Sequence, residues 1–269
     1  MESEVRLLPL LLALILVVTT ILTIFTLIKP EKPRRNNGLV VKEEEILLPY
    51  PSLKGPMSLE EAIARRRSIR EYSDKPLLLM HLSQILWAAQ GITDVKRSFR
   101  AAPSAGATYP LELYVVVGEN GVAINKTYFL KAGVYKYNVK RHSLVLVKEG
   151  DVRESLAKAA LNQEWVRKAP VSIVIVAIYE RTTKFYGERG VRYVLIEVGH
   201  VGQNIYLQAT ALRLGTVAVG AFYDDEVRKI ISASENEHPV YIMPIGIALK
   251  LHELSREELI KYYENNRKG

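Results

Sequence analysis

Cysteine is absent from the sequence, and several familiar catalytic motifs are absent with it. Zero Cys in 269 residues excludes disulfide frameworks, thiolate zinc sites, iron–sulfur clusters and cysteine nucleophiles. The sequence also lacks a G-x-x-x-x-G-K-[ST] phosphate loop, a G-x-G-x-x-G after a strand, an H-E-x-x-H zinc motif and a G-x-S-x-G nucleophile motif. The five histidines are too scattered for a local metal pair, so we expect no metal site.

Acidic residues are too few to balance the basic ones. The chain has 37 Lys and Arg against 29 Asp and Glu, which gives a net charge of +8. Such an excess admits nucleic acid, an anionic cofactor or a membrane surface as a partner. With 48% apolar and 25% charged residues, the chain can bury a core and is not disordered. The positions of the positive charges must decide among these partners.

Charge is missing altogether from one long stretch, residues 8–28. As a helix, these 21 residues would be about 31 Å long, close to the thickness of the hydrocarbon core of a bilayer. A cleaved signal peptide is the alternative. It has a shorter apolar core and a small-residue cleavage site, whereas the charged, proline-containing stretch 29–33 follows here. We expect a retained transmembrane anchor.

The charged residues that flank the predicted anchor indicate its orientation in the membrane. The basic residues after the anchor are Lys29, Lys32, Arg34 and Arg35. The positive-inside rule therefore places the bulk of the protein in the cytoplasm. We expect a single-pass membrane protein with a short extracytoplasmic N-terminus (1–7), an anchor (8–28), a proline-rich tether (29–57) and a cytoplasmic catalytic domain (58–269).

Apolar periodicity predicts an α+β domain from Ser58 onwards. Capping boxes at Ser58/Glu61 and Ser255/Glu258 begin two of its helices. The expected helices are 59–67, 79–90, 191–214, 225–232 and 255–265, and the expected strands are 113–117, 134–139, 143–147, 171–178 and 240–249. Because helices and strands do not alternate strictly, we expect one sheet with helices packed around it. In the tether, 39–41 and 46–48 have the composition of short strands.

The predicted helix 191–214 is apolar on more than one face and contains Gly199 and Gly202. A helix that is apolar nearly all round is a buried helix. Glycines weaken a helix, so their presence suggests close packing against a neighbour. We expect that neighbour to be a second helix or another subunit.

Arginine is concentrated in one segment, residues 65–70 (RRRSIR). The segment can be a solvated helix end, a patch that faces anionic lipid, or a phosphate-binding site. Guanidinium groups bind phosphate through paired charge-assisted hydrogen bonds, and a Ser hydroxyl adds a compact donor. The arginines alone leave these alternatives open.

Two loops are built mainly from small residues. Residues 102–110 (APSAGATYP) lead into the predicted strand 113–117, and 215–222 (GTVAVGAF) follow the predicted long helix. Each can be a simple turn. Small side chains also allow the backbone to approach a flat ligand closely. Together with the arginine cluster, the loops would suit an aromatic cofactor with a phosphate tail.

These features occur in an order that resembles the nitroreductase family of FMN flavoenzymes, in the form of its SagB-type dehydrogenase and thiazole/oxazole oxidase branch. Residues 66–72 (RRSIREY) are similar to its R-R-S-x-R-x-[FY] signature, and 103–112 (PSAGATYPLE) to its second flavin loop. Five further motifs follow in the order of that branch: 133–137 (GVYKY), 169–171 (APV), 189–193 (RGVRY), 199–204 (GHVGQN) and 219–222 (VGAF).

The resemblance implies a central mixed or antiparallel sheet wrapped by helices, and a homodimer formed through the long helix with two FMN sites at the subunit interface. It implies that the FMN phosphate and pyrimidine edge are held by Arg66, Arg67, Ser68 and Arg70. It implies a second flavin contact from the loop Pro103-Ser104-Ala105-Gly106, of which Ser104, Ala105 and Gly106 come from the other subunit. Around the flavin ring it implies Gly220 and Ala221, with a hydrogen bond from Asn162 or Gln163.

The implied activity is ping-pong hydride transfer through the flavin N5, with NADH or NADPH as the reductant and a small molecule or a peptide as the substrate. The branch oxidises azoline rings in peptides with the help of a Lys-Tyr pair. The corresponding catalytic candidates here are Lys184 and Tyr186, which Phe185 separates. An azoline dehydrogenase is therefore the alternative to a general oxidoreductase, and a non-catalytic flavin-binding membrane scaffold is a third hypothesis. Because a cofactor phosphate and membrane topology account for the basic clusters, no nucleic-acid partner is expected.

Overall fold

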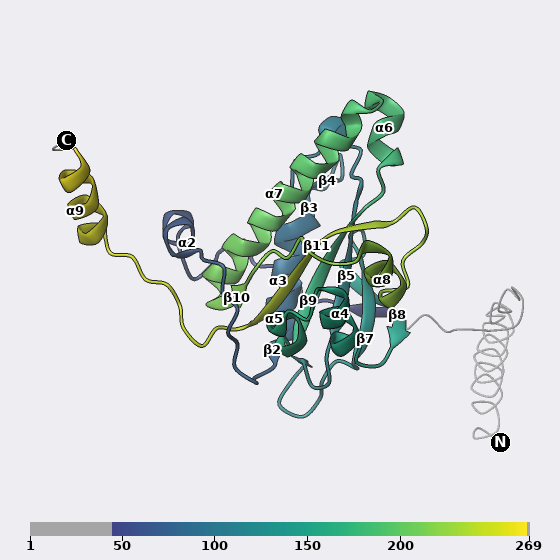
Figure 1. Ribbon diagram of the computed structural model, residues 1–269, viewed down its shortest axis with the longest axis horizontal. Helices are drawn as coiled ribbons and strands as arrows, with labels where there is room; N and C mark the ends of the chain where they lie inside the picture. Colours follow the sequence, from purple (N-terminus) through teal and green to yellow (C-terminus); the bar gives the residue numbers. More distant parts are fainter. Residues whose placement is uncertain (1–44, 268–269) are drawn as a thin grey trace, which may run out of the picture. The chain divides into compact units, whose positions relative to one another are not determined.

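The computed structural model describes residues 45–267, and seven strands of this part form one antiparallel sheet (Figure 1). In spatial order the strands are β1 (Glu45–Leu47), β8 (Ser143–Glu149), β7 (Gly133–Asn138), β5 (Leu111–Val117), β9 (Val171–Ala177), β11 (His238–Ile247) and β10 (Leu214–Thr216). Every neighbouring pair in this sheet is antiparallel. The expected α+β class is confirmed, and the sheet is antiparallel rather than mixed. Two short pairs lie outside it: β2 (Leu77–Leu78) with β6 (Val122–Ala123), and β3 (Ile92–Asp94) with β4 (Phe99–Arg100).

Helices cover both faces of the sheet, and the side chains of β5 show how the faces divide. Leu113 and Val115 belong to the core cluster shared with α3 (Leu79–Gln90) and α7 (Arg189–Ala211). Tyr114 and Val116 point to the other face, where α4 (Arg153–Ala159), α5 (Glu164–Lys168) and α8 (Asp224–Ile230) pack. Since successive residues of a strand face opposite ways, a continuous apolar run such as β5 or β9 must be covered on both sides. This confirms the prediction that both are central strands.

The remaining helices lie at the periphery. They are α2 (Leu59–Arg65), the 3-10 turn η1 (Ala105–Ala107), α6 (Glu180–Tyr186) and α9 (Arg256–Asn266). At α9 both bonds of the predicted capping box form, from Glu258 N to Ser255 Oγ (3.1 Å) and from Ser255 N to Glu258 Oε2 (2.8 Å). At α2 only the first of the two is present, from Glu61 N to Ser58 Oγ (3.2 Å).

In the single chain, the helix predicted over 191–214 is buried on one face and exposed on the other. One face of α7 packs on the sheet, and there Gly202 lies against Tyr241. On the other face Val191, Leu195 and Ile196 are 41–49% exposed, and no atom outside the helix lies within 4 Å of the Cβ position of Gly199. The helix also ends at Ala211, and Leu214–Thr216 pairs with β11 as a strand. The apolar excess of α7 therefore includes an uncovered surface.

The described part of the predicted tether begins with a strand. Glu45–Leu47 pairs with β8 at the edge of the sheet, and the backbone N–H of Leu48 donates to the His142 carbonyl (3.0 Å). The predicted N-terminus (1–7) and anchor (8–28) lie outside the described residues. Between residues 45 and 267, no helix is long and apolar enough to cross a membrane.

Tyr72 links the arginine segment to the sheet. Its ring, 9% exposed, lies over two glycines that face each other across β10 and β11, Gly215 and Gly246. The Tyr72 hydroxyl donates to the Ile69 carbonyl (2.8 Å). A Cβ at Gly246 would lie 2.6 Å from Tyr72 Cγ, and a Cβ at Gly215 would lie 2.6 Å from Ile69 Cγ2 and 3.1 Å from Tyr72 Cε1. The two glycines therefore set the position of the segment that Tyr72 holds.

We expect Gly246→Ala to lower the free energy of unfolding by about 1–3 kcal/mol, the usual cost of overpacking a core. The new Cβ would lie 2.6 Å from Tyr72 Cγ, so the ring or the strand must move. Urea denaturation measures the effect. Gly55→Ala is the matched control, because its Cβ would meet only the Met57 carbonyl, at 3.8 Å. Equal effects of the two substitutions would contradict this packing.

Candidate functional site

The arginine segment runs from the end of α2 along strand β10. Arg66 is the C-cap residue of α2. Beyond it, Ser68 forms a parallel bridge with Thr216, and the Ile69 N–H donates to the Thr216 carbonyl (2.9 Å). The segment thus leaves its helix and continues the edge of the sheet, which leaves Ser68 and Arg70 exposed beside the second small-residue loop.

Tyr206 of α7 joins this segment to the loop after β10. Its hydroxyl accepts a hydrogen bond from the Ala218 N–H (2.8 Å) and lies 3.0 Å from Ser68 Oγ. The Arg66 guanidinium lies over the Tyr206 ring, 5.1 Å from its centroid, a distance typical of a cation–π contact. Sequence reasoning missed Tyr206. Its only signal was its place in the long helix, two residues after the 199–204 motif.

Trp165 and Gln163 join the opposite end of the segment to the same loop. The Arg70 guanidinium lies 5.2 Å from the centroid of the Trp165 ring, and Gln163 Nε2 donates to the Ala221 carbonyl (3.1 Å). We call the whole group the arginine cluster; its members are Arg66, Ser68, Arg70, Gln163, Trp165, Tyr206, Gly220 and Ala221. Six of these eight were candidate site residues in the sequence, and Trp165 and Tyr206 were not.

Two candidates turn away from this cluster. The Arg67 guanidinium donates to the carbonyls of Arg66 (2.7 Å) and Ala64 (3.4 Å) at the end of its own helix. The Asn162 side chain accepts from Arg167 (3.3 Å). Of the pair Asn162 and Gln163, the structure therefore brings only Gln163 to the Gly220-Ala221 loop.

A second group of candidates gathers at the other small-residue loop, and we call it the loop cluster: Pro103, Ser104, Ala105, Gly106 and Tyr186. Gly106 has φ +57°, and a Cβ there would lie 2.6 Å from the Tyr186 hydroxyl. Glycine adopts this conformation without strain and leaves room for the Tyr186 hydroxyl. Tyr186 belongs to α6, which a hydrogen bond between Thr108 and Thr182 (2.8 Å) ties to the loop. Lys184, also on α6, is exposed.

The two clusters lie near opposite ends of α7. Tyr186 packs edge to face on Tyr193 in the first half of that helix, with the ring centroids 5.1 Å apart. Tyr206 comes 13 residues after Tyr193, a rise of about 20 Å along a helix. Figure 1 shows α6 beside one end of α7 and α2 beside the other. Within one chain, the candidates therefore form two separate half-sites.

A buried carboxyl group lies behind the loop cluster. Glu197 of α7 is 2% exposed, and its carboxyl lies next to Ser104 and Gln90, with Arg100 nearby. Burial raises the pKa of Glu197 above its ordinary value of 4.5, and Ser104, Gln90 and Arg100 oppose this shift. Sequence reasoning missed Glu197, because a single Glu in an apolar helix carries no signal of its burial.

The arginine cluster has the donors to bind an anion that carries a polar ring. No carboxylate among residues 45–267 pairs with Arg66 or Arg70. Among the same residues 45–267, Thr216 Oγ1 and Trp165 Nε1 are buried and have no hydrogen-bond partner. Buried donors without partners are costly, so both atoms suit a ligand that would bond to them. Within the described chain, no group of His, Asp and Glu side chains is placed to hold a metal ion.

Comparison with known proteins agrees with this arrangement. Residues 63–247 match the family model described as the Nitroreductase family. The nitroreductase-family protein MJ1384 of Methanocaldococcus jannaschii is 51% identical over 190 residues, which cover 71% of this chain and 91% of that protein. The crystal structure of a nitroreductase-family protein from Ralstonia eutropha JMP134 is similar with a TM-score of 0.66, at 28% identity, over 82% of this chain and 97% of that one.

A third relative comes from Rhizobium leguminosarum bv. trifolii. Its trifolitoxin operon protein TfxC is 25% identical over 231 residues, which cover 80% of this chain and 62% of TfxC. The α+β fold and the matches to nitroreductases support an oxidoreductase. The chain belongs to the nitroreductase family.

We expect the stability of Glu197→Gln, relative to the natural chain, to rise with pH. The pKa of the Glu197 carboxyl is raised above 4.5 in the folded protein, so the folded protein keeps this proton to a higher pH than the unfolded chain does. The stability of the natural protein therefore falls as the pH rises from the unfolded-state pKa to the folded-state pKa. A glutamine side chain does not ionise, so the variant lacks this pH-dependent loss of stability. Urea denaturation from pH 4 upwards, on both chains, measures the difference. Parallel stability profiles would contradict a raised pKa.

Proposed function

We propose that the protein is a membrane-anchored, homodimeric, FMN-dependent oxidoreductase. The observation that carries the proposal is the arginine cluster, in which two guanidinium groups that pair with no carboxylate of residues 45–267 lie beside a loop of small residues. The unpartnered donors Thr216 Oγ1 and Trp165 Nε1 fit the same ligand.

Each part of the arginine cluster has a role toward FMN. Arg66, Ser68 and Arg70 supply charged and hydroxyl donors for the phosphate and the pyrimidine edge. Gly220 and Ala221 form a thin wall for the ring, held in place by the bond from Gln163. Bound there, FMN would supply hydride-transfer chemistry between NADH or NADPH and a second substrate, in a ping-pong cycle.

A dimer through α7 would complete the site. The exposed apolar stripe of α7 includes Val191 and Leu195, with Gly199 one turn further on. If two copies of α7 cross in opposite directions along this stripe, the first half of one helix meets the second half of the other. The loop cluster of one subunit would then face the arginine cluster of its partner. This arrangement would bring together two clusters that lie near opposite ends of α7 in a single chain.

Membrane attachment is the remaining part of the proposal. The charge-free stretch 8–28 and the basic residues that follow it support a single-pass anchor with the catalytic domain in the cytoplasm. The described domain begins at Glu45 with a strand of the sheet, so the anchor would hold an enzyme that folds separately from it.

We expect the purified full chain to show a flavin absorption spectrum that bleaches when NADH or NADPH is added without oxygen. Arg66→Ala should weaken FMN binding about 10- to 150-fold, because it removes a charge-assisted contact of about 1.5–3 kcal/mol. Titration of the apoprotein with FMN measures the dissociation constant.

Arg65→Ala is the matched control for this titration. Arg65 already pairs with Glu61 (3.2 Å) and Glu253 (2.8 Å), so its loss should leave FMN affinity within about twofold. A chain that stays colourless with added FMN would overturn the proposal, as would equal FMN affinities of the Arg66 and Arg65 variants. Flavin that binds but accepts no electrons from any donor would favour the scaffold hypothesis.

A peptide azoline dehydrogenase is the second candidate. It is favoured by the contact between Tyr186 and Gly106, which places a phenol at the proposed flavin loop, and by the relative named as a trifolitoxin operon protein. In such an oxidation the azoline ring loses a hydride to FMN and a proton to a base, and Lys184 and Tyr186 are the candidates for moving that proton.

If this second activity is correct, Lys184→Met and Tyr186→Phe should each slow oxidation of a thiazoline-containing peptide at least about tenfold, a typical loss for a proton-transfer group. Reduction of FMN by NADH should be unchanged. Mass spectrometry follows the loss of two hydrogens from the peptide. Phe185→Leu, on the same exposed helix, is the control. A peptide that is not oxidised by the natural chain, while NADH reduces the flavin, would leave the general oxidoreductase as the function.

A further inference from the structure

Residues 48–57, which we call the strap, follow β1 and cross the surface of α3 along a fixed path. Gln84 of α3 binds the strap backbone twice: its Oε1 accepts from Ser52 N (2.8 Å) and its Nε2 donates to the Ser52 carbonyl (3.1 Å). At the start of the strap, Leu48 N donates to the His142 carbonyl (3.0 Å). The strap is therefore held by hydrogen bonds to two separate elements.

A polar network under the strap fixes Pro49. The Ser83 hydroxyl, 1% exposed, donates to the Pro49 carbonyl (2.5 Å), and His142 Nε2 lies 2.8 Å from Ser83 Oγ and 3.0 Å from that carbonyl. Because the carbonyl only accepts and Ser83 donates to it, the Nε2 proton of His142 points to these two oxygens. His142 Nδ1 then accepts from the Tyr137 hydroxyl (2.8 Å). The network uses a buried serine and a histidine to hold a segment at the surface.

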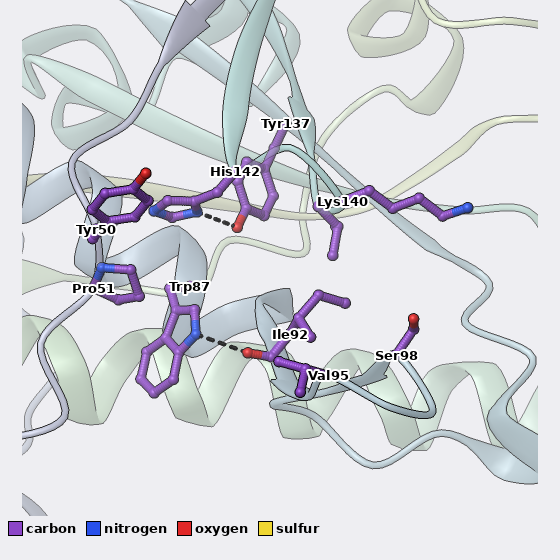
Figure 2. Close-up of a pocket in the computed structure, with 10 residues that line it drawn as sticks. Tyr50, Pro51, Trp87, Ile92, Val95, Ser98, Tyr137, Lys140 and His142 are labelled. Atoms are coloured by element: carbon purple, nitrogen blue, oxygen red, sulfur yellow. Dashed lines mark hydrogen bonds between the residues drawn. The ribbon is translucent and has the colours of Figure 1, made fainter.

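Leu48, at the start of the strap, is buried in the core, but two large apolar side chains further along the strap face outward. Tyr50 is 96% exposed and Leu53 is 85% exposed. On the Tyr50 side, a hollow of about 640 Å³ is lined by Tyr50, Trp87 and Val95, the last 88% exposed; Figure 2 shows Tyr50 and Trp87 on one side of it and Val95 on the other. On the Leu53 side, a hollow of about 590 Å³ is lined by Leu53, Met80 and Trp87. We call these five side chains the strap surface.

Positive charge borders the strap surface. Lys140 lines the first hollow and Lys54 the second, and Lys96 follows Val95 in the sequence. No Asp or Glu is among the described residues that line either hollow. The nearby acidic residues Glu45 and Asp94 are paired with Arg141 (2.7 Å) and Arg97 (2.8 Å). Within residues 45–267, the lysine ion pairs involve other lysines, so no described carboxylate pairs with Lys54, Lys96 or Lys140.

Exposed apolar residues with Tyr and Trp, bordered by lysines, are the composition of a surface that rests at the boundary of an anionic bilayer. The chain outside the structure points to the same occupant. The predicted anchor ends at Ile28, so 16 residues separate it from Glu45. They span at most about 56 Å. The strap begins at Leu48, directly after β1, so it is the first loop of the described domain after this 16-residue connection.

We propose that the strap surface docks on the headgroup region of an anionic membrane and so fixes the orientation of the catalytic domain. The proposal rests on the membrane anchoring of the proposed function. The hydrogen bonds to Gln84, Ser83 and His142 explain how the strap keeps Tyr50 and Leu53 turned outward when they would otherwise fold against the chain.

The two tryptophans of the chain allow a direct test. Trp87 lies in the strap surface, whereas Trp165 packs with the helices on the opposite face of the sheet. The full chain is reconstituted into phosphatidylcholine–phosphatidylglycerol vesicles, with and without acyl chains brominated close to the headgroup. Bromine should quench the fluorescence of Trp165→Phe, which retains Trp87, and should leave that of Trp87→Phe unchanged.

The double variant Tyr50→Glu/Leu53→Glu, made in the Trp165→Phe chain, should lose at least half of this quenching while still floating with the vesicles. Tyr128→Glu, which changes a tyrosine 68% exposed outside the strap surface, is the matched control and should keep it. If the chain does not float with vesicles, both the anchor and the docking are overturned. If it floats and Trp87 is not quenched, or if the double variant is quenched as before, the docking alone is overturned. A second copy or a soluble partner would then be the occupant of the surface.

Discussion

The packing of Tyr72 against Gly215 and Gly246 is the constraint on which the candidate site depends. Two glycines opposite each other on β10 and β11 leave room for one aromatic ring at the edge of the sheet. That ring carries the hydroxyl that holds Ile69, and so directs the arginine segment along β10 rather than into solvent. With the segment in place, Ser68 reaches Tyr206 and Arg70 reaches Trp165. A packing detail of the sheet thus positions the charged groups.

The centre of the fold could be predicted from the sequence, and its edges could not. Strands β5 and β9 are continuous apolar runs because both of their faces are covered, and this pattern is local. The short strand β10 is a Leu-Gly-Thr stretch whose pairing with β11 depends on residues 29 to 33 positions later. From the sequence alone, this stretch is therefore predicted to be part of a loop. In the same way, the exposed face of α7 carries Val191, Leu195 and Ile196 while its buried face carries Glu197, so composition alone could not separate the two faces.

The same distinction separates the site residues that were predicted from those that were missed. Arg66, Ser68 and Arg70 stand in one short motif, and the structure brings all three to one cluster. Arg67 stands in the same motif, but the free carbonyls at the end of α2 take its donors. Tyr206 and Trp165 are distant in sequence from that motif and meet it only through the fold, so no spacing rule could identify them.

The exposed face of α7 and the separation of the two residue clusters along this helix have a common explanation in the proposed dimer. The proposed flavin site combines the arginine cluster with the loop cluster, yet in one chain the two clusters contact α7 at Tyr206 and Tyr193, which are separated by a helix rise of about 20 Å. A single chain could join them only by bending a helix that packs on the core along its length. Two chains can join them without any distortion, since antiparallel contact reverses the order of the clusters. The exposed stripe at Val191, Leu195 and Gly199 has the small and apolar residues that such a contact requires. Dimerisation and ligand binding would then be one equilibrium, because whatever separates the subunits also divides the site.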